Sequence, residues 1–144
     1  MQKNKLFKII IDTNLWVSFI ISDKYYLIDS LLFSKQVVLL FSKELIDEIH
    51  QTINKPKLKK YFKLNGLEEM LLAFEPFIQM VEVESTVSVC RDTKDDFLLA
   101  LAKDGKADYL ITGDKDLLIL EKFGKTKIKT FVVFLDELKN RSAS

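Results

Sequence analysis

The chain alternates between short continuous runs of apolar residues and segments in which apolar residues recur at helical spacing. The continuous runs are typical of strands buried on both faces, and the recurring residues are typical of helices. The predicted strands are Leu6–Ile11, Val37–Phe41, Met80–Val83, Tyr109–Thr112 and Ile128–Val133. The predicted helices are Leu15–Ile21, Tyr25–Phe33, Lys43–Ile53, Leu58–Phe62, Leu67–Phe77, Asp92–Lys103, Lys115–Glu121 and Leu135–Lys139.

Local signals support several of these helix ends. Ser42 is a good N-cap for the helix that follows it, Pro56 stops that helix, and Gly105 closes a later one. Strands alternate with helices along the chain, which favours an α/β fold with a parallel sheet covered on both faces. We expect one domain over residues 1–140 and a frayed tail over 141–144.

Composition narrows the classes of protein that fit. The 144 residues suit one domain, and 48% of them are apolar, which is enough for a core. The net charge of +1 shows no bulk attraction to a polyanion, so a nucleic-acid role must rest on a local patch or a metal.

No apolar run is long enough to span a membrane. The lone Cys90 excludes an internal disulfide and suits a reducing compartment such as the bacterial cytoplasm.

Two acids follow predicted strands directly. Asp12 comes after the first strand and Asp114 after Tyr109–Thr112. In an open parallel sheet, functional sites form at the carboxyl ends of the strands. Each acid alone is as well explained as a helix cap or turn residue. Their matching positions favour a shared site.

The helix Lys43–Ile53 brings a third acid. On a wheel of about 100° per residue, Glu48 lies at the edge of the apolar stripe, whereas Glu44 and Asp47 point further into solvent. Glu48 is therefore the acid expected to be half-buried. His50 also lies near the stripe edge, but a single histidine is more often a surface or packing residue than a ligand.

The segment before Phe97 carries three aspartates. Asp95 lies beside the apolar stripe of the predicted helix, whereas Asp96 falls almost opposite the stripe. Asp92 fits an N-cap with Asp95 closing a capping box, which would occupy Asp95 without any chemistry. Asp95 is the preferred candidate for the site, and Asp92 and Asp96 are its alternatives.

If Asp12, Glu48, Asp95 and Asp114 converge within roughly 10 Å, their charges repel unless a cation lies between them. Carboxylate oxygens suit Mg²⁺ or Mn²⁺, and the sequence has no His or Cys cluster for zinc. Such an ion activates water and stabilises charge on a phosphoryl oxygen, which points to phosphodiester chemistry. With His50 as its single histidine, the sequence does not favour a Ser-His-Asp set, and no glycine-rich phosphate loop is present.

Segments spread over nearly the whole chain resemble, in order, the motifs of PIN domains, a family of metal-dependent nucleases. They are Ile10–Asn14, Ser42–Ile49 with Lys55–Lys57, Arg91–Leu98 and Ala107–Leu118. The chain is most similar to bacterial and archaeal PIN proteins regarded as toxins of toxin–antitoxin systems (VapC-like toxins). The resemblance implies a three-layer α/β/α sandwich with a parallel sheet of about five strands. It also implies cleavage of single-stranded RNA with Mg²⁺ or Mn²⁺, and an antitoxin partner.

The resemblance also assigns roles to residues. The motif acids fall on Asp12, Glu48, Asp95 and Asp114, with Asp116 as a fifth metal ligand. Asn14 and Thr112 fall on positions that orient the acids by hydrogen bonds. The match can slide by one residue at Asp95, which keeps Asp96 open as the ligand.

A lysine cluster near the second motif is either a contact for RNA or a solvated helix end. It consists of Lys55, Lys57, Lys59 and Lys60. The aromatic residues Trp16, Phe19, Tyr25 and Tyr26 follow the first motif closely and predict a homodimer if they are exposed. They equally fit the core.

Two other functions stay open on the sequence. A catalytically silent PIN-like scaffold would bind protein or nucleic acid without cleaving it, although intact acids argue against it. A Mg-dependent phosphatase or phospho-receiver would cluster acids similarly. Such folds usually need a second Asp beside the first, where this chain has Ile11 and Asn14.

Overall fold

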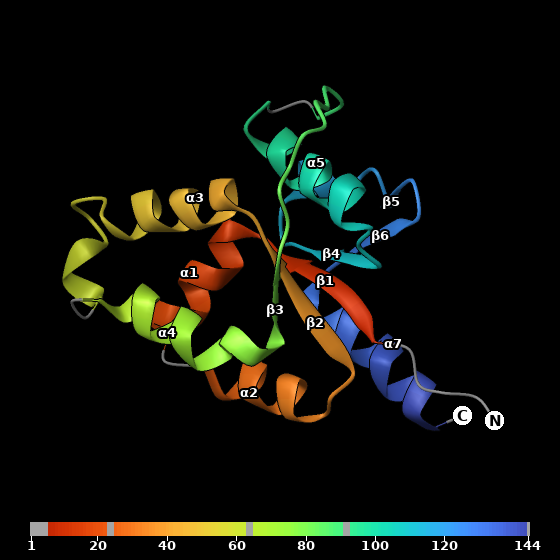
Figure 1. Cartoon of the computed structure of the whole chain (residues 1–144), viewed down its shortest axis with the longest axis horizontal. Helices are drawn as coiled ribbons and strands as arrows, with labels where there is room; N and C mark the ends of the chain where they lie inside the picture. The colour runs from red at the N-terminus through yellow and green to blue at the C-terminus, as the bar shows by residue number, and fades with distance from the viewer. Residues whose placement is uncertain (1–5, 23–24, 63–64, 91–92, 144) are drawn as a thin grey trace.

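The computed structural model describes residues 6–22, 25–62, 65–90 and 93–143, and places helices on both faces of a central sheet (Figure 1). The strands are β1 (Phe7–Ile11), β2 (Val37–Phe41), β3 (Ile78–Met80), β4 (Tyr109–Ile111), β5 (Lys122–Phe123) and β6 (Thr126–Lys129). The α-helices are α1 (Thr13–Ile21), α2 (Tyr25–Phe33), α3 (Lys43–Ile53), α4 (Gly66–Phe74), α5 (Asp96–Gly105), α6 (Lys115–Leu118) and α7 (Phe131–Ala143). Short 3₁₀ turns are η1 (Lys59–Tyr61), η2 (Glu75–Phe77) and η3 (Thr93–Asp95).

The sheet of the described residues has the strand order β3-β2-β1-β4-β6-β5. Neighbouring strands in this sheet are parallel, except that β5 is antiparallel to β6. Ile9 of β1 pairs with Leu39 on one side and Tyr109 on the other, so β1 lies between β2 and β4. The α/β class and the mostly parallel sheet are confirmed. The sheet also has a sixth strand, β5, that the sequence analysis did not predict. This strand is only two residues long, which is too short to show a pattern of apolar residues.

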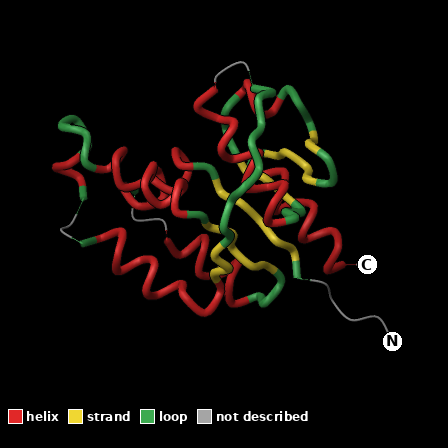
Figure 2. Tube along the Cα trace, turned by 45° about the horizontal axis from the view of Figure 1, so that its top comes forward, coloured by secondary structure: helices red, strands yellow, loops and turns green. Residues whose placement is uncertain are grey.

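Alternate side chains of the strands pack against different helices. Phe41 meets Trp16 of α1 with ring centroids 5.3 Å apart, and Tyr109 meets Phe134 of α7 at 4.9 Å. On the other face, α5 packs across β1, β2 and β4. A Cβ at Gly105 would lie 2.8 Å from Leu40 Cδ1, so glycine there permits this close approach. The arrangement is three-layered, as Figure 2 also shows.

Several predicted elements have different bounds in the structure. The strand predicted over Met80–Val83 lies at Ile78–Met80, and the helix predicted to begin at Asp92 begins at Asp96. The strand predicted over Ile128–Val133 ends at Lys129, and Phe131 already begins α7. The backbone N–H of Val133 donates to Thr130 Oγ1 at 3.2 Å, so Thr130 caps the start of this helix. The first residues of the helix, Phe131–Val133, are all apolar and were therefore predicted as the end of a strand. The helix continues to Ala143, through most of the segment predicted as a tail.

Two of the four aromatic residues behind the predicted homodimer are buried. Trp16 and Phe19 are 1% and 8% exposed and belong to the core. Tyr26 is 60% exposed, and the Tyr25 side chain lies outside the described part of the structure. The homodimer stays a prediction, and among the three of these side chains that the structure describes, only Tyr26 offers an exposed ring that supports it. No helix among the described residues is both long and apolar enough to cross a membrane.

Candidate active site

Asp12 lies at the end of β1, in the centre of the sheet, and is only 5% exposed. Its Oδ1 accepts a hydrogen bond from the backbone N–H of Asn14 at 2.7 Å and caps α1. Its Oδ2 accepts a hydrogen bond from Thr112 Oγ1 at 2.5 Å. Capping thus uses one carboxylate oxygen, and a neighbouring strand holds the other. Asn14 supports Asp12 through its backbone, while its side chain is exposed.

Thr112 connects Asp12 to Asp114. The threonine follows β4 and is fully buried, and its Oγ1 accepts a hydrogen bond from the backbone N–H of Asp114 at 3.0 Å. Asp114 Oδ1 accepts from the backbone N–H of Asp116 at 2.8 Å and caps α6. Asp114 and Asp116 are half-buried. The two acids predicted at strand ends are therefore joined by one hydrogen-bonded chain, with Asp116 on the next turn.

Asp96 is buried, contrary to the helical wheel. It is 8% exposed, and its Oδ1 accepts hydrogen bonds from the backbone N–H groups of Cys90 at 2.8 Å and Val89 at 3.1 Å. These bonds hold the pKa of Asp96 below the ordinary aspartate value, with the bond from Cys90 contributing most. Asp96 therefore holds the preceding loop against the start of α5.

Asp95 does not act as the predicted capping-box residue. The helix α5 begins at Asp96 after the 3₁₀ turn η3, so Asp95 occupies the N-cap position, and its side chain makes no capping hydrogen bond. Asp92, the proposed cap, lies outside the described residues. Asp95 is half-buried.

Several acids lie close enough to the thiol of Cys90 to affect its pKa. Burial raises the pKa of Cys90 to about 12, helped by its hydrogen bond with Asp96 and by the charges of Asp96, Asp95 and Asp114. The acids that begin α5 and α6 therefore act on the same side chain. A thiol with this pKa is neutral near pH 7.

Glu48 is half-buried on α3, whereas Glu44 and Asp47 are exposed, as the wheel predicted. Ser42 begins this helix, because its Oγ accepts the backbone N–H of Leu45 at 3.1 Å. The helix packs beside α1 and α5, which carry Asp12 and Asp95 at their starts. His50 is exposed. The convergence of all four acids within roughly 10 Å stays a prediction.

The donor set fits a hard divalent cation. Asp12 and Asp114 present carboxylate oxygens fixed by hydrogen bonds, and such oxygens are the ligands that Mg²⁺ and Mn²⁺ prefer. Within the described ranges, however, no three His, Cys, Asp or Glu side chains are grouped so as to hold an ion. One or two carboxylates would therefore bind the ion directly and the other acids through water, which is usual for Mg²⁺.

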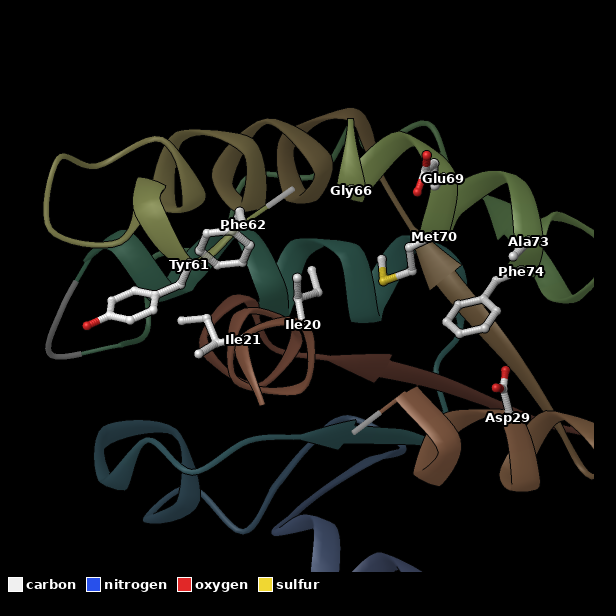
Figure 3. Close-up of a pocket in the computed structure, with 10 residues that line it drawn as sticks. All are labelled: Ile20, Ile21, Asp29, Tyr61, Phe62, Gly66, Glu69, Met70, Ala73 and Phe74. Atoms are coloured by element: carbon white, nitrogen blue, oxygen red, sulfur yellow. The ribbon is translucent and has the colours of Figure 1, made fainter. Parts of the chain in front are cut away.

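A groove lies away from these acids. It has a volume of about 520 Å³ and lies between α1, α2, α4 and η1 (Figure 3). Its wall is mostly apolar and includes Ile20, Tyr61, Phe62 and Met70, and Asp29 and Glu69 lie toward one end. None of the predicted site acids lines the groove.

Fold and site agree with one class of protein. A family model described as PIN domain matches residues 8–116, and the chain belongs to this family. PIN domains are generally nucleases that use divalent metal ions. The match includes Asp12, Glu48, Asp95, Asp114 and Asp116 and stops before β5 and α7.

Two known proteins are similar to this chain. The chain is 34% identical over 128 residues to the uncharacterized protein MJ1680 of Methanocaldococcus jannaschii, covering 87% of this chain and 81% of the relative. The solved structure of the PIN domain of human SMG5 superposes with a TM-score of 0.52 at 13% identity, covering 91% of this chain and 98% of the other. At this identity the second match shows the fold alone.

Proposed function

We propose that this PIN-domain protein is a Mg²⁺- or Mn²⁺-dependent endoribonuclease that cleaves single-stranded RNA. The hydrogen-bonded chain Asp12–Thr112–Asp114 at the carboxyl edge of the sheet carries the proposal. The charges of Asp95 and Asp114 on one thiol support a common cluster. A buried carboxylate such as Asp12 needs a compensating cation, and no salt bridge in the described part of the chain supplies one.

Each residue has a role in the proposed reaction. Asp12 and Asp114 would hold the ion directly, with Asp95, Glu48 and Asp116 as further ligands or as acceptors for its water. When bound, the ion supplies an activated water and neutralises charge on the phosphoryl group. Thr112 fixes the carboxylate of Asp12 through its hydroxyl and the backbone of Asp114 through its lone pair. Such supporting groups commonly change metal affinity or activity about 10–100-fold.

A cleavage assay tests the proposed activity. The purified chain is incubated with single-stranded RNA, with RNA duplex and with single-stranded DNA, each in EDTA, Mg²⁺ and Mn²⁺. We expect cleavage of single-stranded RNA only with a divalent ion. An inert protein under all conditions would favour the alternative of a silent PIN-like scaffold.

We also propose that the nuclease is the toxin of a toxin–antitoxin pair. The apolar groove, with Asp29 and Glu69 at one end, supports a protein partner whose apolar segment carries a Lys or Arg opposite these acids. A small reading frame directly upstream of this gene would encode the antitoxin. Expression of the chain should arrest growth, and co-expression of the upstream product should relieve the arrest. Growth unaffected by the active nuclease would exclude the toxin role while leaving the nuclease intact.

A further inference from the structure

Two lysines occupy corresponding positions at the carboxyl edge of the sheet. Lys43 is the first residue of α3 after the cap Ser42, and Lys115 is the first residue of α6 after the cap Asp114. The strand before α3 is β2, and the strand before α6 is β4. Because β1 lies between β2 and β4, the two lysines flank the end of β1, where Asp12 lies. Two strand spacings correspond to roughly 10 Å.

The position of Lys43 is electrostatically unfavourable for the fold. The start of a helix carries partial positive charge and prefers acidic residues, so a lysine there brings no stabilisation from the helix dipole. In α3 the first turn also offers Glu44, and Asp47 lies four residues from Lys43, yet no ion pair forms with either. Residues that break a local rule without a compensating contact are commonly functional.

Two other lysines have acidic partners. Lys125 pairs with Asp108 at 3.5 Å, and Lys129 pairs with Glu137 at 3.8 Å. Lys43 and Lys115 are exposed and have no ion pair among the residues that the structure describes. Their ammonium groups are thus available to an anionic ligand at the edge where the acids lie.

The predicted lysine cluster lies at the other end of α3. Lys55, Lys57, Lys59 and Lys60 follow the last residue of the helix and are all exposed. With about 1.5 Å of rise per residue, the helix separates them from Lys43 by about 15 Å. Lys60 also lies over the Tyr61 ring, with Nζ 5.2 Å from its centroid. This cluster can meet only a more distant part of an RNA strand that is cleaved beside Asp12.

We propose that Lys43 and Lys115 bind the RNA phosphates on either side of the phosphate that is cleaved, and so position the strand across Asp12. The inference rests on the proposed nuclease function. An RNA backbone approaching the carboxylates of Asp12 and Asp114 is repelled, and two flanking ammonium groups offset this repulsion next to the reaction centre. This placement supplies the local basic patch that a chain with net charge +1 lacks in bulk.

Binding to a short single-stranded RNA tests the proposal separately from catalysis. The Asp12→Asn background suppresses cleavage, and affinity is measured at several NaCl concentrations without divalent ions. Each phosphate contact to a single strand contributes about 0.7 to the slope of log K against log salt, so K43Q with K115Q should lower the slope by about 1.4. We also expect about tenfold weaker binding at low salt.

Two matched variants control for charge. K122Q with K139Q removes the same charge from exposed lysines elsewhere and should leave the slope unchanged. The quadruple substitution of Lys55, Lys57, Lys59 and Lys60 by Gln tests the competing location. An unchanged slope in K43Q with K115Q, or a slope lost only in the quadruple variant, would overturn the proposal even if the wild type cleaves RNA. A wild type that cleaves no RNA would instead remove the proposed function.

Discussion

The two halves of the candidate site are held together in different ways. At the ends of β1 and β4, Asp12 and Asp114 each cap a helix within two residues of their own position, and Thr112 joins them. At the start of α5, Asp96 is oriented by backbone groups six and seven residues earlier, through a loop. The first half depends on strand ends that a sequence pattern marks. The second depends on how a loop docks, which no periodic pattern records.

The largest expected effect comes from the first half. Asp12→Asn should lower RNA cleavage at least about a hundredfold, because the site loses one negative charge and binds its ion more weakly. The fold should persist within a few degrees of melting temperature, because Asn can still accept from Asn14 and donate to Thr112 Oγ1. Cleavage rates with Mn²⁺ and thermal melting without metal check both parts. Undiminished cleavage by the variant would contradict the role of Asp12.

Sequence reasoning reached this half of the site because its determinants are local. Ile9–Ile11 and Tyr109–Thr112 mark buried strands, and an acid after a parallel strand must lie at the carboxyl edge. The burial of Glu48 relative to Glu44 and Asp47 also followed from the wheel. The role of Thr112 came from the family resemblance, and the structure confirms its hydrogen bond to Asp12.

The second half was not predictable in the same way. The wheel placed Asp96 opposite the apolar stripe, but the loop through Val89 and Cys90 covers that side and buries it. Likewise, Phe131–Val133 was predicted as part of a strand, because three consecutive apolar residues do not show the spacing that distinguishes a helix from a strand. Thr130, a polar residue with capping ability directly before that run, was the available signal for α7.

Thr112→Val isolates the link between the two strand ends. The substitution keeps the shape of the side chain and removes the hydroxyl that contacts Asp12 Oδ2 and the backbone N–H of Asp114. Cleavage should fall about 10–100-fold, and unfolding should become easier by about 1–3 kcal/mol because buried polar atoms lose their partner. Steady-state kinetics measures the loss of cleavage, and urea denaturation measures the change in the free energy of unfolding. Equal loss of stability with full activity would make Thr112 purely structural.

Neighbouring aspartates at α5 should separate function from stability. Asp96→Ala leaves the N–H groups of Val89 and Cys90 without their acceptor and should destabilise the chain by about 1–3 kcal/mol. Asp95→Asn should instead reduce cleavage while melting stays near that of the wild type. The reverse result, with Asp96→Ala inactive but stable and Asp95→Asn fully active, would assign the ligand to Asp96.

Low pH should weaken the hydrogen bonds by which Asp96 and Asp104 hold the chain before α5, with a smaller effect than the substitutions above. The pKa of Asp96 is lowered in the fold, so its contribution is complete above the unfolded value of about 3.9 and is lost as pH falls through the lower folded pKa. The pKa of Asp104 is lowered too, mainly by hydrogen bonds from Ser85 and then from the backbone of Glu84. Hydrogen-exchange protection at Ser85, Val89 and Cys90 should hold at pH 5 and fall below pH 3. Protection that is constant across this range would contradict the anchoring role of the two carboxylates.

The central claim is that the acids at this sheet edge hold a divalent ion, and Mn²⁺-dependent melting tests it without any substrate. An ion that binds only the folded chain stabilises it by about 2.7 kcal/mol at a hundred times its dissociation constant. The melting temperature of the wild type should therefore rise with Mn²⁺, and that rise should be absent or much smaller in Asp12→Asn. Equal rises in both proteins, or no rise in the wild type at millimolar Mn²⁺, would contradict a metal site at Asp12.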